Sequence, residues 1–210
     1  MISGRAKATV VAVLASACAW AQAPRDEVDA LLAALAREPP QTIAFLEVRS
    51  SPLLARELSL EGSLEYLGPG KLSRVVSAPY AEQTIIDGDA VRIRRGNRAE
   101  RRFSLSRAPG LGGFLAGLAA ILSGDRGTLE HEFEISMAGA AQDWQLTLVP
   151  RSHELRERVG SIRLRGAAGS TRCVVTAGPA GETVAELLLG EAAARGRDAS
   201  WRALNCGSLP

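Results

Sequence analysis

Apolar and polar residues alternate one by one along most of the chain, a pattern typical of strands with one buried and one solvated face. The clearest example is the stretch 58–66, in which Leu58, Leu60, Leu64 and Tyr66 alternate with serine and glutamate. Weaker alternation predicts further strands at residues 42–49, 72–77, 80–86, 90–95, 101–105, 144–149, 161–165, 172–176 and 183–188. Short turn-forming sequences separate these segments, so we expect an antiparallel meander.

The stretch 129–137 also alternates and predicts a strand that places His131 on its apolar side. A lone histidine in that position is more often a core residue than a catalyst. Loss of activity on His131→Ala, with folding intact, is the result that would identify an enzyme. Glu130, Glu132 and Glu134 would share the opposite face of the strand. There a solvated outer surface is a commoner explanation than a cation site or an acid–base cluster.

Two segments have the helical period instead. In residues 26–37, apolar side chains recur at spacings of three and four until Pro39 and Pro40 end the pattern. Residues 110–123 are apolar all round, so this helix must be buried, although its four glycines weaken it. Two interpretations are open: an ordinary core helix, or a lid that fills an apolar cavity and moves away when cargo enters. The bulky side chains along one side of this helix are Leu111, Phe114, Leu115, Leu118, Ile121 and Leu122.

The abundance of one-sided strands restricts the architecture. A wide sheet with one apolar face must curl on itself, pack against another sheet or be covered by helices. We therefore predict an α+β fold that is mostly antiparallel β. A single domain is expected over residues 25–190, followed by a flexible tail over residues 191–210, which is rich in alanine, arginine and glycine.

The first residues predict an exported protein. Arg5 and Lys7 precede a short apolar run that ends in an A-x-A site at Ala19–Ala21, which is typical of a signal peptide over residues 1–21. The alternative is a lipoprotein processing box that leaves a lipidated Cys18. Export would bring Cys173 and Cys206 into an oxidising periplasm, where they either pair or remain two free thiols.

The composition argues against several classes of function. A net charge of +2 and an aromatic content of 4% favour neither nucleic-acid binding nor base stacking. The chain has no G-x-S-x-G, H-E-x-x-H, phosphate-loop or G-x-G-x-x-G motif. We therefore expect no catalytic residue, no cofactor and no metal site, and a monomer that holds an apolar molecule.

Two charged features could contact a ligand or partner. Phe45, Glu47 and Arg49 share one strand face, where they either meet a polar headgroup at a cavity mouth or form a plain surface ion pair. The predicted hairpin 92–102 carries six arginines and a single acid, Glu100. It either touches anionic lipid headgroups or an acidic partner, or is a solvated hairpin whose charges limit edge pairing.

An ordered set of motifs spans the chain: Phe45–Arg49, Gly62–Tyr66 leading into Pro69–Leu72, Ile86–Asp89, Leu122–Asp125 and Trp144–Pro150. In order and spacing this set resembles the periplasmic outer-membrane lipoprotein carriers of the LolA-like family. It is most similar to a divergent branch often encoded near fatty-acid or aryl-polyene pigment biosynthesis genes. The resemblance runs from the first helix to about Leu189.

The resemblance implies an open, curved half-barrel sheet with helices covering its concave face. It also implies a cavity that shelters the acyl chains of a lipoprotein between an inner-membrane donor and an outer-membrane acceptor. The chain departs from the best-known carriers at Gly68, where they have an arginine before the proline, and at Leu72, where they have an aromatic residue. Another acylated or polyene lipid is therefore an alternative cargo.

The predicted function is that of a periplasmic carrier for a lipoprotein or other lipid. The alternatives are an accessory or scaffold factor of envelope biogenesis that binds no cargo, and an enzyme whose site the motifs do not reveal. The side chains predicted to line the cargo cavity are Leu60, Leu64, Tyr66, Phe103, Phe133, Ile135, Trp144 and Leu146. Such a function requires an apolar hollow that the protein's own side chains do not fill.

Overall fold

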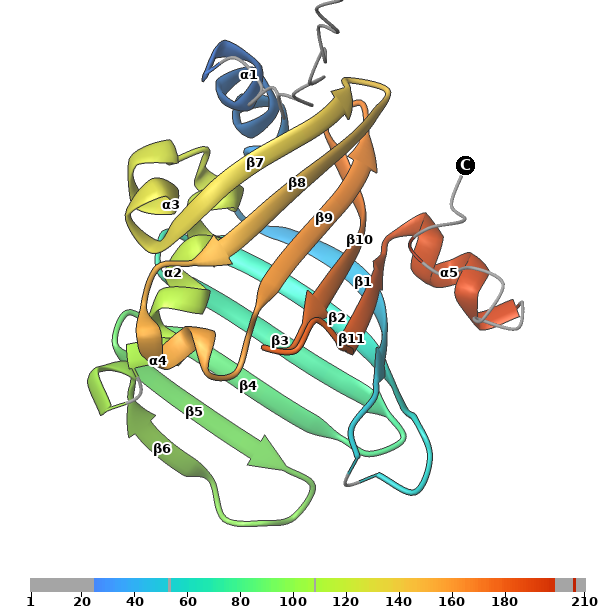
Figure 1. Ribbon diagram of the computed structural model, residues 1–210. Coiled ribbons are helices and arrows are strands. Elements are labelled where there is room, and N and C mark those ends of the chain that lie inside the picture. The colour runs from blue at the N-terminus through green and yellow to red at the C-terminus, as the bar shows by residue number, and fades with distance from the viewer. Residues whose placement is uncertain (1–24, 53, 108, 199–205, 207–210) are drawn as a thin grey trace, which may run out of the picture.

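The computed structural model describes residues 25–52, 54–107, 109–198 and 206, so the predicted signal peptide and Cys18 lie outside the described residues. One strongly curved antiparallel sheet carries helices on both faces (Figure 1). The strands are β1 (Gln41–Arg49), β2 (Leu58–Gly68), β3 (Lys71–Ala78), β4 (Glu82–Asp87), β5 (Ala90–Arg95), β6 (Arg101–Ser104), β7 (Phe133–Ala140), β8 (Asp143–Pro150), β9 (Ser161–Ala167), β10 (Ser170–Ala177) and β11 (Thr183–Leu189). The helices are α1 (Arg25–Leu35), α2 (Pro109–Ser123), α3 (Arg126–Glu132), α4 (His153–Arg156) and α5 (Glu191–Asp198), with a 3₁₀ turn η1 (Leu105–Arg107).

The sheet consists of two meanders joined side by side. Its strand order is β6-β5-β4-β3-β2-β1-β11-β10-β9-β8-β7, so each meander follows the chain and the pairing of β1 with β11 unites them. Strands β6 and β7 lie at the two edges of the sheet, which therefore does not close. The predicted fold class, α+β with an open and mostly antiparallel sheet, is confirmed.

Strand register decides which side chains share the concave face. Phe45 and Glu47 of β1 stand opposite Gly62 and Leu60 of β2, and on the other side Glu47 stands opposite Leu187 of β11. Residues directly opposite one another in a ladder point to the same side of a sheet. The apolar members of the alternating strands thus line a single surface.

Helices cover only one part of that surface. The main core lies where α1, α2, α3 and α4 meet strands β7–β9, and Figure 1 shows α2 lying between the two meanders. Trp144 and Leu146 of β8 are completely buried there, and Leu32 of α1 and Leu129 of α3 pack with them. This cluster fastens the helices to the second meander.

Helix α3 corrects the prediction of a strand over residues 129–137, because the strand begins only at Phe133. The side chain of Asp125 caps the helix by accepting a hydrogen bond from the Thr128 backbone amide at 3.0 Å. The hydroxyl and amide of Thr128 hold the pKa of the Asp125 carboxyl below its usual value. The alternation misled because Leu129 and Phe133 are also four residues apart, which puts them on one side of a helix.

The same correction moves His131, whose side chain is 82% exposed and lies 3.0 Å from the carboxylate of Glu132. It does not face the core, and Glu130, Glu132 and Glu134 do not line a common strand face. The structure therefore shows neither the inward-facing histidine nor the row of three glutamates on one strand face that the alternation predicts.

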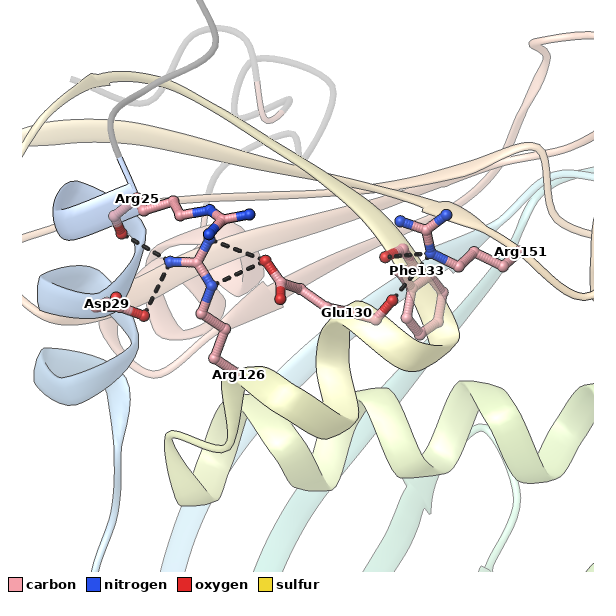
Figure 2. Close-up of polar contacts among 6 residues, drawn as sticks. All are labelled: Arg25, Asp29, Arg126, Glu130, Phe133 and Arg151. Atoms are coloured by element: carbon pink, nitrogen blue, oxygen red, sulfur yellow. Dashed lines mark hydrogen bonds and ion pairs between the residues drawn. The ribbon is translucent and has the colours of Figure 1, made fainter.

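Two arginines fix α3 in place (Figure 2). The guanidinium of Arg126 donates to the backbone carbonyl of Arg25 at 2.7 Å and to the carboxylate of Asp29 at 2.9 Å, which ties α3 to α1. It also donates to Glu130, one turn along its own helix. Arg151, just after β8, donates to the backbone carbonyl of Glu130 at 2.9 Å. The end of α3 is thus held between α1 and the sheet.

Helix α5 corrects the prediction of a flexible tail for the part of residues 191–210 that the structure describes. It packs on the convex face against β1, β10 and β11, outside the half-barrel (Figure 1). Ala192 and Ala193 are buried there. A Cβ added at Gly196 would lie 2.8 Å from Leu46 and 2.9 Å from Leu188, so the small residues allow the helix to lie close to the sheet. The alanine-rich composition predicts disorder, but in the structure it allows close packing of α5 on the sheet.

The small side of α2 is a packing surface as well. A Cβ added at Gly117 would lie 2.3 Å from a ring carbon of Phe133, which is 1% exposed. At Gly112 the nearest atoms, those of Leu105, would be 3.8 Å away, an ordinary contact distance. Glycine is thus needed sterically at Gly117 but not at Gly112.

Alanine substitutions at these two glycines are expected to have opposite effects on stability. Gly112→Ala gains helix propensity and is expected to raise the free energy of unfolding by about 0.5–1 kcal/mol. Gly117→Ala forces an added methyl against Phe133 and is expected to lower it by about 1–3 kcal/mol. Chemical denaturation of both variants measures the two effects. Stabilisation by Gly117→Ala would show that α2 is not packed tightly on Phe133.

Candidate functional site

The side chains predicted to line a cargo cavity fall into two groups. Phe133, Trp144 and Leu146 are at most 1% exposed and belong to the helix-covered core. Leu60 and Tyr66 of β2 are also buried. Leu64, Phe103 and Ile135 are only half-buried. Most of the predicted lining therefore consists of filled core.

A more open apolar surface lies on the concave side of the first meander, where none of helices α1–α4 packs into a buried cluster with the strands. We call it the apolar floor; its half-buried members are Leu64, Leu72, Ile86, Ile93 and Phe103 of the first meander (β1–β6), together with Leu187 of β11, the strand of the second meander that pairs with β1. Leu72 stands directly opposite Ile86 between β3 and β4, and Val91 of β5 lies between Ile86 and Phe103. Large aliphatic side chains in such a row are usually covered. The floor is therefore a candidate surface for an apolar ligand.

Helix α2 presents its bulky side chains partly uncovered. Ile121 is buried, whereas Leu115, Leu118 and Leu122 are half-buried. The side chains of Leu111 and Phe114 lie outside the described residues. The predicted lid helix therefore has one side fixed to the core through Gly117 and another side that retains contact with solvent.

A charged network crosses the concave face at one end of the floor; we call it the rim network. At its centre is Glu47, 8% exposed, whose carboxylate accepts from Arg49 Nε at 2.6 Å and from the guanidinium of Arg74. Arg74 also lies 3.9 Å from Glu82. Arg95 lies 3.8 Å from the second oxygen of Glu82. Strands β1, β3, β4 and β5 each supply at least one member.

Two aromatic rings support the rim network. The guanidinium of Arg74 lies 4.7 Å from the centre of the Phe45 ring, and that of Arg95 lies 3.8 Å from the centre of the Tyr80 ring. Both distances fall within the range of cation–π attraction. Phe45 itself is completely buried, so of the three residues predicted at a cavity mouth only Arg49 is exposed.

Contacts within the rim network favour the charged form of Arg49. Burial opposes the charge on Arg49, but the hydrogen bond and attraction from Glu47 outweigh it and raise the pKa of Arg49. Three arginines face two glutamates, so the network has an excess of one positive charge. The rim network therefore keeps one uncompensated positive charge, which can attract an anionic group.

The sequence pattern identified Phe45, Glu47 and Arg49, missed Arg74, Tyr80 and Glu82, and assigned Arg95 to the arginine-rich hairpin instead. A signal was present: Arg74 stands in the apolar register between Leu72 and Val76 of β3. A charged residue in an apolar register is either unpaired or meets an opposite charge inside the fold. Identifying Glu47 as its partner required the strand pairing.

Other kinds of site find no support in the part of the chain that the structure describes. No three histidine, cysteine, aspartate or glutamate side chains gather there as a metal site would need. None of the described helices combines the length and the apolar character needed to cross a membrane. A disulfide joins Cys173 to Cys206, with Cα atoms 5.8 Å apart, on the convex face beneath α5.

Comparison with known families and structures yields consistent likenesses. Residues 20–206 match the profile described as "Outer membrane lipoprotein carrier protein LolA-like". No curated protein matches the sequence.

Among solved structures, a LolA superfamily protein from Nitrosomonas europaea is similar, with 9% identity and a TM-score of 0.40 over 78% of this chain and 91% of that one. A putative outer membrane lipoprotein-sorting protein domain from Vibrio parahaemolyticus has 11% identity and a TM-score of 0.42, over 78% and 88% of the two chains. The Pseudomonas aeruginosa MucA/MucB complex gives 13% identity and a TM-score of 0.40, over 77% and 55%.

Proposed function

Because the chain belongs to the LolA-like family of outer membrane lipoprotein carrier proteins, we propose that it is a periplasmic carrier that shelters acyl chains on its concave face and moves them toward the outer membrane. The cargo is an acylated lipoprotein or another lipid with long hydrocarbon chains. The observation that carries the proposal is the apolar floor, an aliphatic row on the concave face that the helices leave half-buried.

The cargo chains would lie between the apolar floor and the bulky side of α2. Leu115 and Leu118 of α2 are half-buried, as are Leu72 and Ile86 of the floor, so both surfaces have apolar area left to cover. Each methylene removed from water contributes roughly 0.8 kcal/mol. A chain of about sixteen carbons therefore supplies on the order of 10 kcal/mol before the costs of ordering it.

Release requires that the empty site cover part of its own apolar surface. A partly self-covered floor lowers the net gain on binding, so that cargo can leave again. Helix α2 supplies this cover with its bulky side. Gly117 is packed against Phe133, so the C-terminal half of α2 stays on the core when cargo binds. The bulky side chains and the N-terminal turns of the helix move aside to make room for the cargo.

The rim network would receive the polar end of the cargo. It lies on the same face as the floor, and Arg49 and Arg95 are exposed, with side-chain exposures of 47% and 45%. Its excess positive charge suits a phosphate or carboxylate group. The hydrocarbon would then run along the floor while the headgroup stays at the rim.

Paired substitutions on the two faces of β3 and β4 test the proposal. Leu72→Gln with Ile86→Gln makes the floor polar and is expected to weaken binding of a fluorescent long-chain fatty acid at least tenfold. Val75→Gln with Ile85→Gln changes the same strands on the convex face, where both residues are also half-buried, and is expected to leave binding within about twofold. Mass spectrometry of the wild-type protein from its own periplasm is expected to show co-purified lipid. Equal losses in both variants, or no binding by the wild type, would contradict a carrier site on the floor.

A second candidate function has a specific observation in its favour. Leu60, Tyr66, Phe133, Trp144 and Leu146 of the predicted lining are buried, as a filled core requires. That arrangement fits an accessory or scaffold factor of envelope biogenesis that binds no lipid. Protein that is free of lipid when purified from the periplasm, and that fails to bind the fatty acid, would favour this function.

A further inference from the structure

The hairpin formed by β5 and β6 concentrates positive charge at one edge of the sheet. Arg92 and Arg102 stand directly opposite each other in the ladder, and Arg94 follows on the same convex face. Arg98 lies in the turn, and Arg101, the first residue of β6, stands opposite Ile93 and therefore points to the concave side of the same edge. We call these five residues the arginine hairpin. Like charges placed opposite one another destabilise a strand pair, so the arrangement is unfavourable without external anions.

Internal partners compensate little of this charge. Arg102 pairs with Glu100 at 2.5 Å, and Arg94 donates to the neutral amide oxygen of Gln83 at 2.9 Å. Within the described part of the chain, Arg92, Arg98 and Arg101 form no ion pair. The whole chain has a net charge of only +2, so the excess charge is a local property of this edge.

We propose that the arginine hairpin docks the protein on the surface of an anionic phospholipid bilayer. Guanidinium groups match phosphate oxygens in geometry, and each basic side chain near an anionic membrane strengthens attachment by roughly fivefold. An acidic protein is the less suitable partner, because protein interfaces are built around a buried apolar centre. On the convex face of β4–β6 the only large apolar side chain is Ile85, which is already half-buried.

The position of the hairpin gives docking a consequence. Arg95, the last residue of β5, belongs to the rim network through Tyr80 and Glu82. The turn that carries Arg98 begins at the next residue, at the lower end of the sheet in Figure 1. A bilayer in contact with the hairpin therefore lies beside the rim of the concave face. The docking itself goes beyond the proposed carrier function and does not depend on it.

Flotation with lipid vesicles tests the inference on the full mature chain. Wild-type protein is expected to bind vesicles that contain phosphatidylglycerol at low salt, to bind pure phosphatidylcholine vesicles weakly, and to dissociate as salt is raised. The variant with Arg92, Arg98 and Arg101 all changed to glutamine is expected to bind anionic vesicles on the order of 100-fold more weakly. These three arginines have no described ion pair, so folding is expected to be unaffected, which circular dichroism checks.

A matched variant shows whether vesicle binding depends on the arginine hairpin itself or only on the net charge of the protein. Arg158, Arg163 and Arg195 are exposed, lie outside the hairpin and take part in no described ion pair. Changing them to glutamine removes the same charge and is expected to alter vesicle binding by no more than about threefold. Equal losses in the two triple variants, or equal binding of the wild type to both kinds of vesicle, would overturn the proposal. So would binding to polyglutamate without binding to anionic vesicles, which would assign the surface to an acidic protein. Docking that persists when the floor variant has lost fatty-acid binding would show that the two proposals stand separately.

Discussion

Replacement of Glu47 by leucine is expected to lower the free energy of unfolding by about 2–4 kcal/mol, because removing one member of a buried ion pair leaves the other charge without compensation. The Glu47 carboxylate accepts from Arg49 and from Arg74, and the side chain of Arg74 is only 22% exposed. Leucine fills a similar volume but accepts no hydrogen bond. The loss stays below that of a fully enclosed pair, since Glu82 remains 3.9 Å from Arg74. Urea unfolding followed by circular dichroism measures the effect.

Two further variants make this result interpretable. Glu134 of β7 is exposed and takes part in no described ion pair, so Glu134→Leu is expected to change stability by less than about 0.5 kcal/mol. Adding Arg74→Leu to Glu47→Leu removes the uncompensated charge and is expected to restore part of the lost stability. If Glu47→Leu costs no more than Glu134→Leu, the rim network does not contribute to folding.

Replacement of both Cys173 and Cys206 by alanine is expected to destabilise the folded protein by about 3–4 kcal/mol. The disulfide closes a loop over a sequence separation of 33 residues, which restricts the unfolded chain. Both cysteines are buried beneath α5, together with Leu46 and Leu188. Without the bond, Cys206 loses its covalent link to Cys173 of β10. Guanidinium unfolding, compared between wild type and variant, measures the difference.

Reductant supplies the control for the disulfide. It is expected to lower the denaturation midpoint of the wild type toward that of the double-alanine variant and to leave the variant itself unchanged. Hydrogen exchange is expected to show faster exchange of the α5 amides in both disulfide-free forms. A wild-type midpoint that does not respond to reductant, with the thiols shown to be free, would contradict a stabilising disulfide.

Strand alternation predicted most of the sheet, because most strands have one apolar face on the concave side and the other face in water; β1, β10 and β11, which α5 covers on the convex face, are exceptions. It failed where two periods coincide, as at Leu129 and Phe133, which suit a strand and a helix equally well. The cap from Asp125 decides between them, and it acts on a backbone amide that the alternation does not register. Helix α5 was missed for a different reason, since alanine and glycine indicate close packing only when the opposing surface is known. The family resemblance drawn from the motifs is confirmed.

The candidate site was only partly predictable. Leu64 and Phe103 were expected to face a cargo and lie on the apolar floor, whereas Trp144 and Leu146 have the same alternation and lie in filled core. Periodicity identifies the face of a strand but not what covers that face. The coverage depends on where α2 and α3 pack, which is a tertiary property. The partners of Glu47 likewise come from other strands, so they follow from register and not from spacing along the chain.

The pairing of β1 with β11 has a consequence for how the chain folds. Every other ladder in the sheet joins consecutive strands and closes early between near neighbours, whereas this one brings Phe45 to Leu189. Closing so long a loop costs entropy that local contacts do not recover, so sheets held by distant pairings assemble slowly. The two meanders can form before β1 pairs with β11. Until then, β1 and β11 are unpaired edge strands. The folding protein is therefore most prone to aggregation in the interval before these two strands pair.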